Sequence, residues 1–197
     1  MVGEAGGDGR QAEILLVRHG ETEWSAAGRH TSRTDLPLVE AGRERASALG
    51  QELAGRSFAL VLCSPLRRAQ ETCELAGFGA AAVVDEDLRE WDYGEYEGMR
   101  TVEIRERRPD WWLWRDGAPG GEQPSDVAAR ADRVLERLRG AGGDAVAFAH
   151  GHILRVVASR WVGEDAAFGG HLLLGAGGLS VLGYERETPA IARWNLG

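Results

Sequence analysis

The chain has 197 residues, and its 23 Lys and Arg against 31 Asp and Glu give a formal net charge of −8. This acidic balance argues against nucleic acid or a membrane surface as the main partner, because both favour a basic face. The only two cysteines, Cys63 and Cys73, are too few for a disulfide framework, and Cys63 sits in an apolar run that predicts a buried free thiol.

Residues 1–11 are rich in glycine and lack the apolar core of a signal peptide. We therefore expect a loose tail before a single domain over residues 12–197, and a cytoplasmic protein. The apolar run Ile14 to Val17 leads directly into Arg18 and His19, which fits a buried parallel strand. Because ligands of open α/β sheets bind at the carboxyl ends of strands, this strand predicts an anion site at Arg18 and His19.

The rest of the chain alternates predicted strands with predicted helices. Residues 20–38 read as a long loop, and residues 110–121, with three tryptophans, as a lid or insertion loop. Ser64 and Pro65 predict the N-cap and first position of a helix, and a turn is expected at Thr188-Pro189. Strands are predicted over 58–63, 81–84, 145–149, 179–184 and 190–194, and helices over 39–53, 66–76, 101–108, 125–139 and 153–162. This order predicts an α/β fold with a mostly parallel sheet and helices on both faces.

Two of the apolar strands end in the same dipeptide. The strand over 145–149 is followed by His150 and Gly151, as the first strand is followed by His19 and Gly20. A single histidine at a strand end is most often structural, but the repetition favours a site, and glycine lets backbone N–H groups approach a ligand. Arginine is the best bidentate partner of phosphate. Together these residues predict phosphoryl chemistry on a histidine.

Two further residues fit that chemistry. Arg68 falls in the first turn of the helix over 66–76, where an arginine opposes the helix dipole by about 0.3–1 kcal/mol unless an anion binds there. Glu90 lies in an aromatic, acidic segment and is a candidate proton donor, because a carboxyl near phosphate and aromatic surface can have a raised pKa. Asp92 competes with Glu90 for this role, and the spacing leaves both open.

The motifs are similar to those of the histidine phosphatase superfamily, the phosphoglycerate-mutase-like proteins. They follow the family order over nearly the whole chain: LVRHGETEW (16–24), TDLPLVEAG (34–42), SPLRRAQET (64–72), LREWDYGEYEG (88–98), GAPGGE (117–122) and FAHGH (148–152). The resemblance implies a three-layer α/β/α sandwich without a metal or organic cofactor. It also implies that His19 is the nucleophile that becomes phosphohistidine, that Glu90 is the general acid and then the base, and that the phosphoryl oxygens are held by Arg18, Arg68 and His150.

Within the superfamily, the segment over 88–122 resembles acid phosphatases and sugar-bisphosphatase-like members. Mutases carry asparagine where Ser25 and His152 stand and a longer insertion after the Glu90 segment. We therefore expect a phosphomonoesterase that acts on small phosphorylated metabolites and binds inorganic phosphate; a phosphoglycerate mutase or a sugar bisphosphatase is the alternative. The substrate-binding residues are expected to be Arg18, Ser25, Thr31, Arg68, Tyr93, Gly151 and His152, with Trp24, His30, Trp91 and the tryptophans of 110–121 framing the leaving group.

Two other functional classes and a homodimer are further alternatives. His150 and His152 form an HxH pair that His19, His171 and Glu90 would complete as a zinc shell, although an adjacent arginine would repel a dication. A phosphate-binding protein with a relic site is the third class. Trp161 and Trp194 would mark a homodimer interface if they were exposed, but core packing explains them equally.

Overall fold

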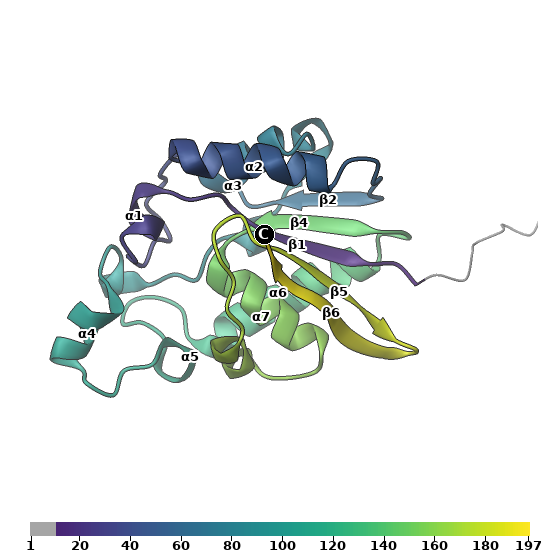
Figure 1. Ribbon diagram of the computed structural model, residues 1–197. Helices are drawn as coiled ribbons and strands as arrows, with labels where there is room; N and C mark the ends of the chain where they lie inside the picture. Colours follow the sequence, from purple (N-terminus) through teal and green to yellow (C-terminus); the bar gives the residue numbers. More distant parts are fainter. Residues whose placement is uncertain (1–10) are drawn as a thin grey trace, which may run out of the picture.

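The computed structural model describes residues 11–197, so the predicted tail lies outside the described residues except for Gln11. A six-stranded sheet in the order β3-β2-β4-β1-β5-β6 forms its centre (Figure 1). The four strands β3, β2, β4 and β1 are parallel, whereas β5 runs antiparallel to both β1 and β6. The strands are β1 (Ile14–Arg18), β2 (Leu60–Cys63), β3 (Ala82–Val84), β4 (Ala145–Ala149), β5 (Leu179–Glu185) and β6 (Thr188–Leu196).

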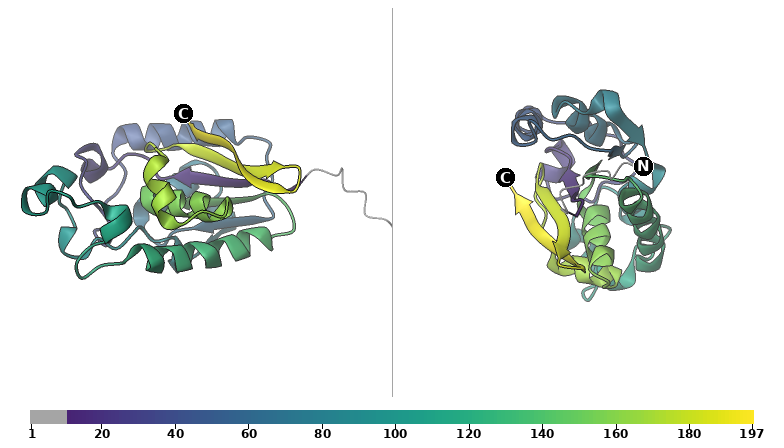
Figure 2. Two further views of the ribbon diagram at one scale, coloured as in Figure 1. Left: turned by 90° about the horizontal axis from the view of Figure 1, so that it is seen from below. Right: turned by 90° about the vertical axis from the view of Figure 1, so that its right-hand side faces the viewer.

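Helices cover both faces of this sheet, which confirms the predicted α/β class. Helices α2 (Glu40–Glu52) and α3 (Arg67–Leu75) cover one face, and α6 (Pro124–Arg139) and α7 (Gly151–Trp161) cover the other (Figures 1 and 2). Beyond the carboxyl ends of the parallel strands lie three short helices, α1 (Glu23–Ala26), α4 (Thr101–Arg107) and α5 (Leu113–Asp116). Four 3₁₀ helices complete the described chain: η1 (Gly79–Ala81), η2 (Glu86–Leu88), η3 (Gly94–Tyr96) and η4 (Ala166–His171).

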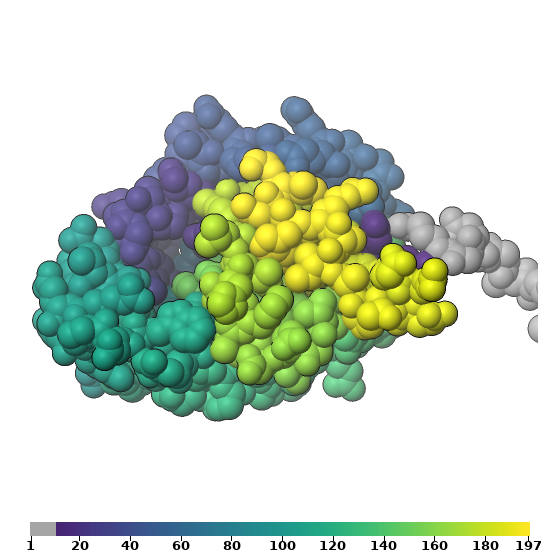
Figure 3. Space-filling view, turned by 60° about the horizontal axis from the view of Figure 1, so that its bottom comes forward, coloured from purple at the N-terminus to yellow at the C-terminus, as the bar shows by residue number. Residues whose placement is uncertain are grey.

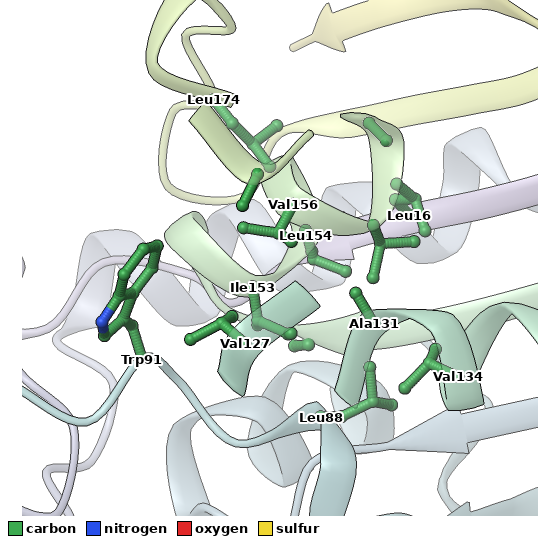
Figure 4. Packing of buried hydrophobic residues seen from close by; sticks show 14 of the residues in the cluster. Leu16, Leu88, Trp91, Val127, Ala131, Val134, Ile153, Leu154, Val156 and Leu174 are labelled. Carbon is green, nitrogen blue, oxygen red and sulfur yellow. The ribbon is translucent and has the colours of Figure 1, made fainter. Parts of the chain in front are cut away.

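The alternation of side chains along β1 divides the core in two. Leu15 and Val17 pack in the cluster under α2 and α3, while Ile14 and Leu16 pack on the opposite face. The larger cluster lies between the sheet and the helices α6 and α7, where Leu16 faces side chains of both helices (Figure 4). Among residues 11–197, no helix combines the length and apolar character that a bilayer crossing requires.

Two local predictions are wrong. Helix α3 begins at Arg67, with Leu66 at the N-cap, and the Ser64 hydroxyl lies just before it, where it contacts His150 Nε2 at 2.7 Å and accepts from the Leu66 N–H at 3.3 Å. The turn between β5 and β6 lies at residues 186–187, and Pro189 belongs to β6. The strand β6 is at the edge of the sheet, where a proline is tolerated because its missing N–H breaks no essential ladder.

The structure also decides between the two alternatives for Trp161 and adds a short helix to each of two predicted loops. Trp161 is only 2% exposed, and its indole N–H lies 3.1 Å from the carbonyls of Gly183 and Ala190, so it packs in the core and marks no interface. The segment over 110–121 is not an open lid: it contains α5, and Trp111 and Trp114 are buried. The loop over 20–38 contains α1. Both cysteines are buried free thiols, as predicted for Cys63.

Candidate active site

The two His-Gly dipeptides meet at the carboxyl ends of β1 and β4. These strands are parallel neighbours, with Arg18 paired to Ala149, and the backbone N–H of His19 donates to the Ala149 carbonyl at 2.9 Å. The following residues, His19 and His150, therefore lie side by side, with ring centroids 5.1 Å apart. The strand ends thus bring together residues that are far apart along the chain.

His19 has one ring nitrogen fixed and the other free. Its Nδ1 lies 2.7 Å from the Gly20 carbonyl, which only accepts, so Nδ1 carries the proton and Nε2 keeps its lone pair. Burial lowers the pKa of His19 to about 3, and the positive charges of Arg18 and Arg68 act in the same direction. The backbone beyond it is anchored, because the Gly20 N–H donates to the Thr72 hydroxyl at 3.0 Å. The ring is therefore neutral and positioned, as a nitrogen nucleophile must be.

Glu90 caps helix α7 from a distant part of the chain. Its carboxylate accepts from the backbone N–H groups of His152 at 3.1 Å and Ile153 at 3.0 Å, the positions that an N-cap side chain normally reaches. Burial raises the pKa of Glu90, but His152 and these N–H groups outweigh it and hold the pKa well below its ordinary value. The predicted raised pKa is thus wrong for this structure, in which the carboxyl is ionised.

The Arg18 guanidinium has one buried N–H donor that lacks a partner among the described residues. Its Nη1 donates to the Leu174 carbonyl at 2.5 Å, but its Nε is buried and has no hydrogen-bond partner in the described part of the chain. Burial lowers the pKa of Arg18. A buried donor without a partner is costly, and an anionic oxygen in the site would satisfy it.

Arg68 and His150 lie behind the residues that line the cavity. Arg68, only 1% exposed, donates through Nε to His150 Nδ1 at 3.1 Å and through its Nη groups to the carbonyls of Thr31 and Thr34, both at 3.1 Å. These carbonyls account for an arginine in the first turn of α3, where the sequence suggested a bound anion. His150 is fully buried, and its other ring nitrogen contacts Ser64.

A cavity of about 180 Å³ opens over His19 and Glu90. It is smaller than the roughly 300–1,000 Å³ of pockets for drug-sized ligands, so it fits a small molecule. Figure 3 shows a hollow where the purple segment around α1, the teal segment around α4 and the yellow-green segment before β5 meet. The cavity is lined by Arg18, His19, Thr22, Ser25, Gly28, Arg29, His30, Thr31, Glu90, Tyr93, Gly151, His152, Arg155 and Leu174.

Every predicted substrate-binding residue except Arg68 lines this cavity. Sequence reasoning missed Thr22, Gly28, Arg29, Arg155 and Leu174. For Arg155 a signal existed, because residues three apart on a helix share a face and His152 was already a candidate. The other four carry no comparable pattern.

An aromatic wall closes one side of the cavity. The Tyr93 hydroxyl lies 2.6 Å from His152 Nδ1, and the rings of His30 and Tyr93 have centroids 4.7 Å apart. Burial raises the pKa of Tyr93 well above its ordinary value, so its hydroxyl keeps its proton. Trp91, a predicted framing residue, is fully buried and does not line the cavity.

The same geometry bears on the two competing assignments, Asp92 as the proton donor and a zinc site. Asp92 pairs with Arg33 and does not line the cavity, whereas Glu90 does. Within residues 11–197, no three His, Cys, Asp or Glu side chains are grouped to hold a metal ion. His171, a predicted member of the zinc shell, is exposed and lies against Trp112.

Comparison with known proteins gives the family. The model of the histidine phosphatase superfamily (branch 1) matches residues 14–197. An acid phosphatase of Mycobacterium tuberculosis is 39% identical over 189 residues, which cover 93% of this chain and 92% of that protein. The sedoheptulose 1,7-bisphosphatase of Saccharomyces cerevisiae is 36% identical over 181 residues, which cover 76% of this chain and 67% of that protein.

A solved structure, that of an open reading frame product of Mycobacterium tuberculosis, matches the fold with a TM-score of 0.91 at 38% identity, covering 95% of this chain and 98% of that one. The chain therefore belongs to the histidine phosphatase superfamily. It is a histidine-type phosphatase, that is, a phosphoric monoester hydrolase.

Proposed function

We propose that the protein hydrolyses phosphomonoesters of small metabolites, in the manner of an acid phosphatase, through a phosphohistidine at His19. The observation that carries the proposal is the state of His19: Nδ1 donates to the Gly20 carbonyl, so the lone pair of Nε2 is free in the cavity that also contains Arg18, whose buried Nε lacks a partner among the described residues. A nucleophile next to a buried cationic donor is the arrangement that covalent phosphoryl transfer needs.

In the first step, His19 Nε2 forms a bond to phosphorus as the ester P–O bond breaks. Arg18 neutralises the phosphoryl charge, and Arg68 and His150 support it from behind. Glu90 gives a proton to the departing alkoxide. A bound phosphoryl group places negative charge next to the Glu90 carboxylate, which raises its pKa, so that Glu90 takes up that proton from solvent before the ester bond breaks.

In the second step, water attacks the phosphohistidine. Glu90, now ionised, takes a proton from the water, the new O–P bond forms, and the N–P bond to His19 breaks. Inorganic phosphate leaves, Glu90 releases its proton to solvent as that negative charge departs, and both side chains return to their starting states. Two displacements replace one difficult step.

The test is the variant His19→Ala assayed with 4-nitrophenyl phosphate. We expect kcat to fall by about 10³-fold or more, since the nucleophile is gone. A rapid-quench experiment with labelled substrate should trap an acid-labile phosphoenzyme in the wild type and none in the variant. The matched control is His171→Ala, an exposed histidine outside the cavity. Turnover retained by His19→Ala would overturn the proposal.

Two further measurements separate the alternatives. A mutase would interconvert phosphoglycerates faster than it releases inorganic phosphate, so a screen of phosphoglycerates and sugar phosphates that scores both products ranks the two activities. A zinc-dependent hydrolase would lose activity in EDTA, whereas the histidine mechanism predicts that activity is retained.

A further inference from the structure

Arg155 is held in a fixed position at the edge of the cavity. It lies on α7, and its Nε donates to the Gly169 carbonyl at 2.8 Å. Its guanidinium stacks over Trp114, with Cζ 4.5 Å from the ring centroid. Trp114 in turn packs tightly on Gly169, where a Cβ would come within 2.5 Å of the ring. A planar guanidinium held between a ring and a carbonyl loses little freedom when it binds a ligand.

The positive charge of Arg155 has no carboxylate partner among the described residues. Within residues 11–197 its Nη groups make no hydrogen bond and no ion pair, although the side chain is largely withdrawn from water. Arg160, on the same helix, instead pairs with Asp132 at 2.8 Å. Burial lowers the pKa of Arg155 to about 10, against the opposing charge of Glu90. A withdrawn cation without a counter-ion favours the binding of an anion.

Arg155 lies about one helical turn beyond the start of α7. Gly151 begins the helix beside Glu90 and Arg18, and Arg155 follows four residues later, about 6 Å along the axis. Arg29 adds another cation to the lining, and no ion pair engages it in the described chain. The cavity of an acidic protein therefore contains three arginines, Arg18, Arg29 and Arg155, against the single carboxylate of Glu90.

We propose that Arg155 binds a second anionic group, a phosphate or a carboxylate, on the leaving-group side of the substrate. The preferred substrates are then phosphomonoesters that carry such a second group, and Arg155 determines this specificity. The inference rests on the proposed phosphatase function and deepens it.

The experiment compares Arg155→Gln with the wild type on esters with and without a second anion. Glycerol 3-phosphate has none, 3-phosphoglycerate carries a carboxylate, and fructose 1,6-bisphosphate carries a second phosphate. We expect kcat/KM of the variant to fall about 10- to 100-fold for the anionic ester that the wild type prefers, mainly through KM, because a charge-assisted contact is lost. Glycerol 3-phosphate should be affected far less. The ester that shows the larger loss identifies the second group as carboxylate or phosphate.

Two controls separate this role from a structural one. Arg160→Gln, on the same helix, should leave the substrate preference unchanged, and Arg155→Lys, which retains the charge, should restore part of the preference. An equal loss for all three esters, or no loss for any, would overturn the inference. A wild type that hydrolyses glycerol 3-phosphate and rejects both anionic esters would overturn the subsite alone, whereas a wild type that hydrolyses no ester would overturn the proposed function and the subsite with it.

Discussion

The ionisation states of His19 and Glu90 are set by their immediate neighbours. The imidazole is neutral because it is buried beside Arg18 and Arg68, and the carboxyl is ionised because it accepts backbone N–H groups at the start of α7. A neutral nucleophile and an ionised base are the states that attack and water activation require. His19 is therefore prepared for its attack before substrate binds, whereas Glu90 must first take up the proton that it gives to the alkoxide.

Glu90→Gln tests the acid–base role at this scale. Glutamine can still accept a hydrogen bond from α7 but cannot exchange a proton, so we expect kcat for an alkyl phosphate to fall about 10²- to 10⁴-fold. The first step with 4-nitrophenyl phosphate should suffer less, because nitrophenolate leaves without a proton. Steady-state rates and the burst of nitrophenolate measure the two effects.

Asp92→Asn is the matched control for Glu90→Gln, since Asp92 pairs with Arg33 and does not line the cavity. Its activity should stay near the wild-type value. The reverse ranking, with Asp92→Asn the more damaging variant, would move the proton-transfer role to Asp92.

At the scale of elements, the loop between α1 and α2 is held over the cavity by two charged side chains. Glu97 accepts from its backbone N–H groups, and Arg68 donates to its carbonyls. The carboxylate of Glu97 accepts from the N–H groups of Ser32 and Thr34, with the contact to Thr34 at 3.0 Å, and from the Ser32 hydroxyl at 2.7 Å. Arg68 binds carbonyls of the same stretch. These contacts join the loop to the segment that carries Glu90.

Glu97→Ala should release this loop. It leaves two part-buried N–H groups and the Ser32 hydroxyl without this acceptor, so we expect the free energy of unfolding to fall by about 1–3 kcal/mol, measured by urea denaturation. KM for phosphate esters should also rise, because Thr31 lies in the released stretch. Glu95→Ala, an exposed carboxylate two residues earlier, is the control and should change neither quantity. Equal stability of the two variants would show that Glu97 does not anchor the loop.

At the scale of the whole molecule, buried histidines make the fold sensitive to acid. Burial lowers the pKa of His19 to about 3 and that of His30 to about 4, and it also lowers the pKa of His150 and His152. The unfolded chain therefore binds more protons than the folded one between the ordinary histidine pKa and these values. The contribution of these histidines to the free energy of unfolding is fully present above that ordinary pKa and is lost as the pH falls below it.

We expect the free energy of unfolding to decrease between pH 7 and pH 5, by about 2 kcal/mol for each of His19 and His30. Asp87, whose pKa is lowered to about 2 by the Arg133 hydrogen bond, loses its contribution only at lower pH, so this window isolates the histidines. Urea denaturation at both pH values measures the change. His30→Asn should flatten the pH dependence and His171→Asn should not; unchanged wild-type stability at pH 5 would contradict the prediction.

Much of the site was predictable because several of its residues stand at the ends of predicted strands. A short apolar run followed by Arg18 and His19 indicates where a buried strand ends, and the recurrence before His150 supports it. Glu97 gave no such signal, because nothing in its local sequence shows that its carboxylate binds a loop some 63 residues earlier. Ser64 gave a partly misleading signal: its hydroxyl accepts from the Leu66 N–H, but the helix begins later, and the pattern does not show the contact with His150.

By itself, the sequence determined the α/β class, the strand ends and the family, since all three follow from short-range pattern and motif order. The tertiary structure alone decided the ionisation of Glu90, the burial of Trp161 and the place of Arg155 in the cavity. These properties depend on which groups approach from distant parts of the chain and on how much water they exclude. Neither quantity is encoded in the spacing of neighbouring residues.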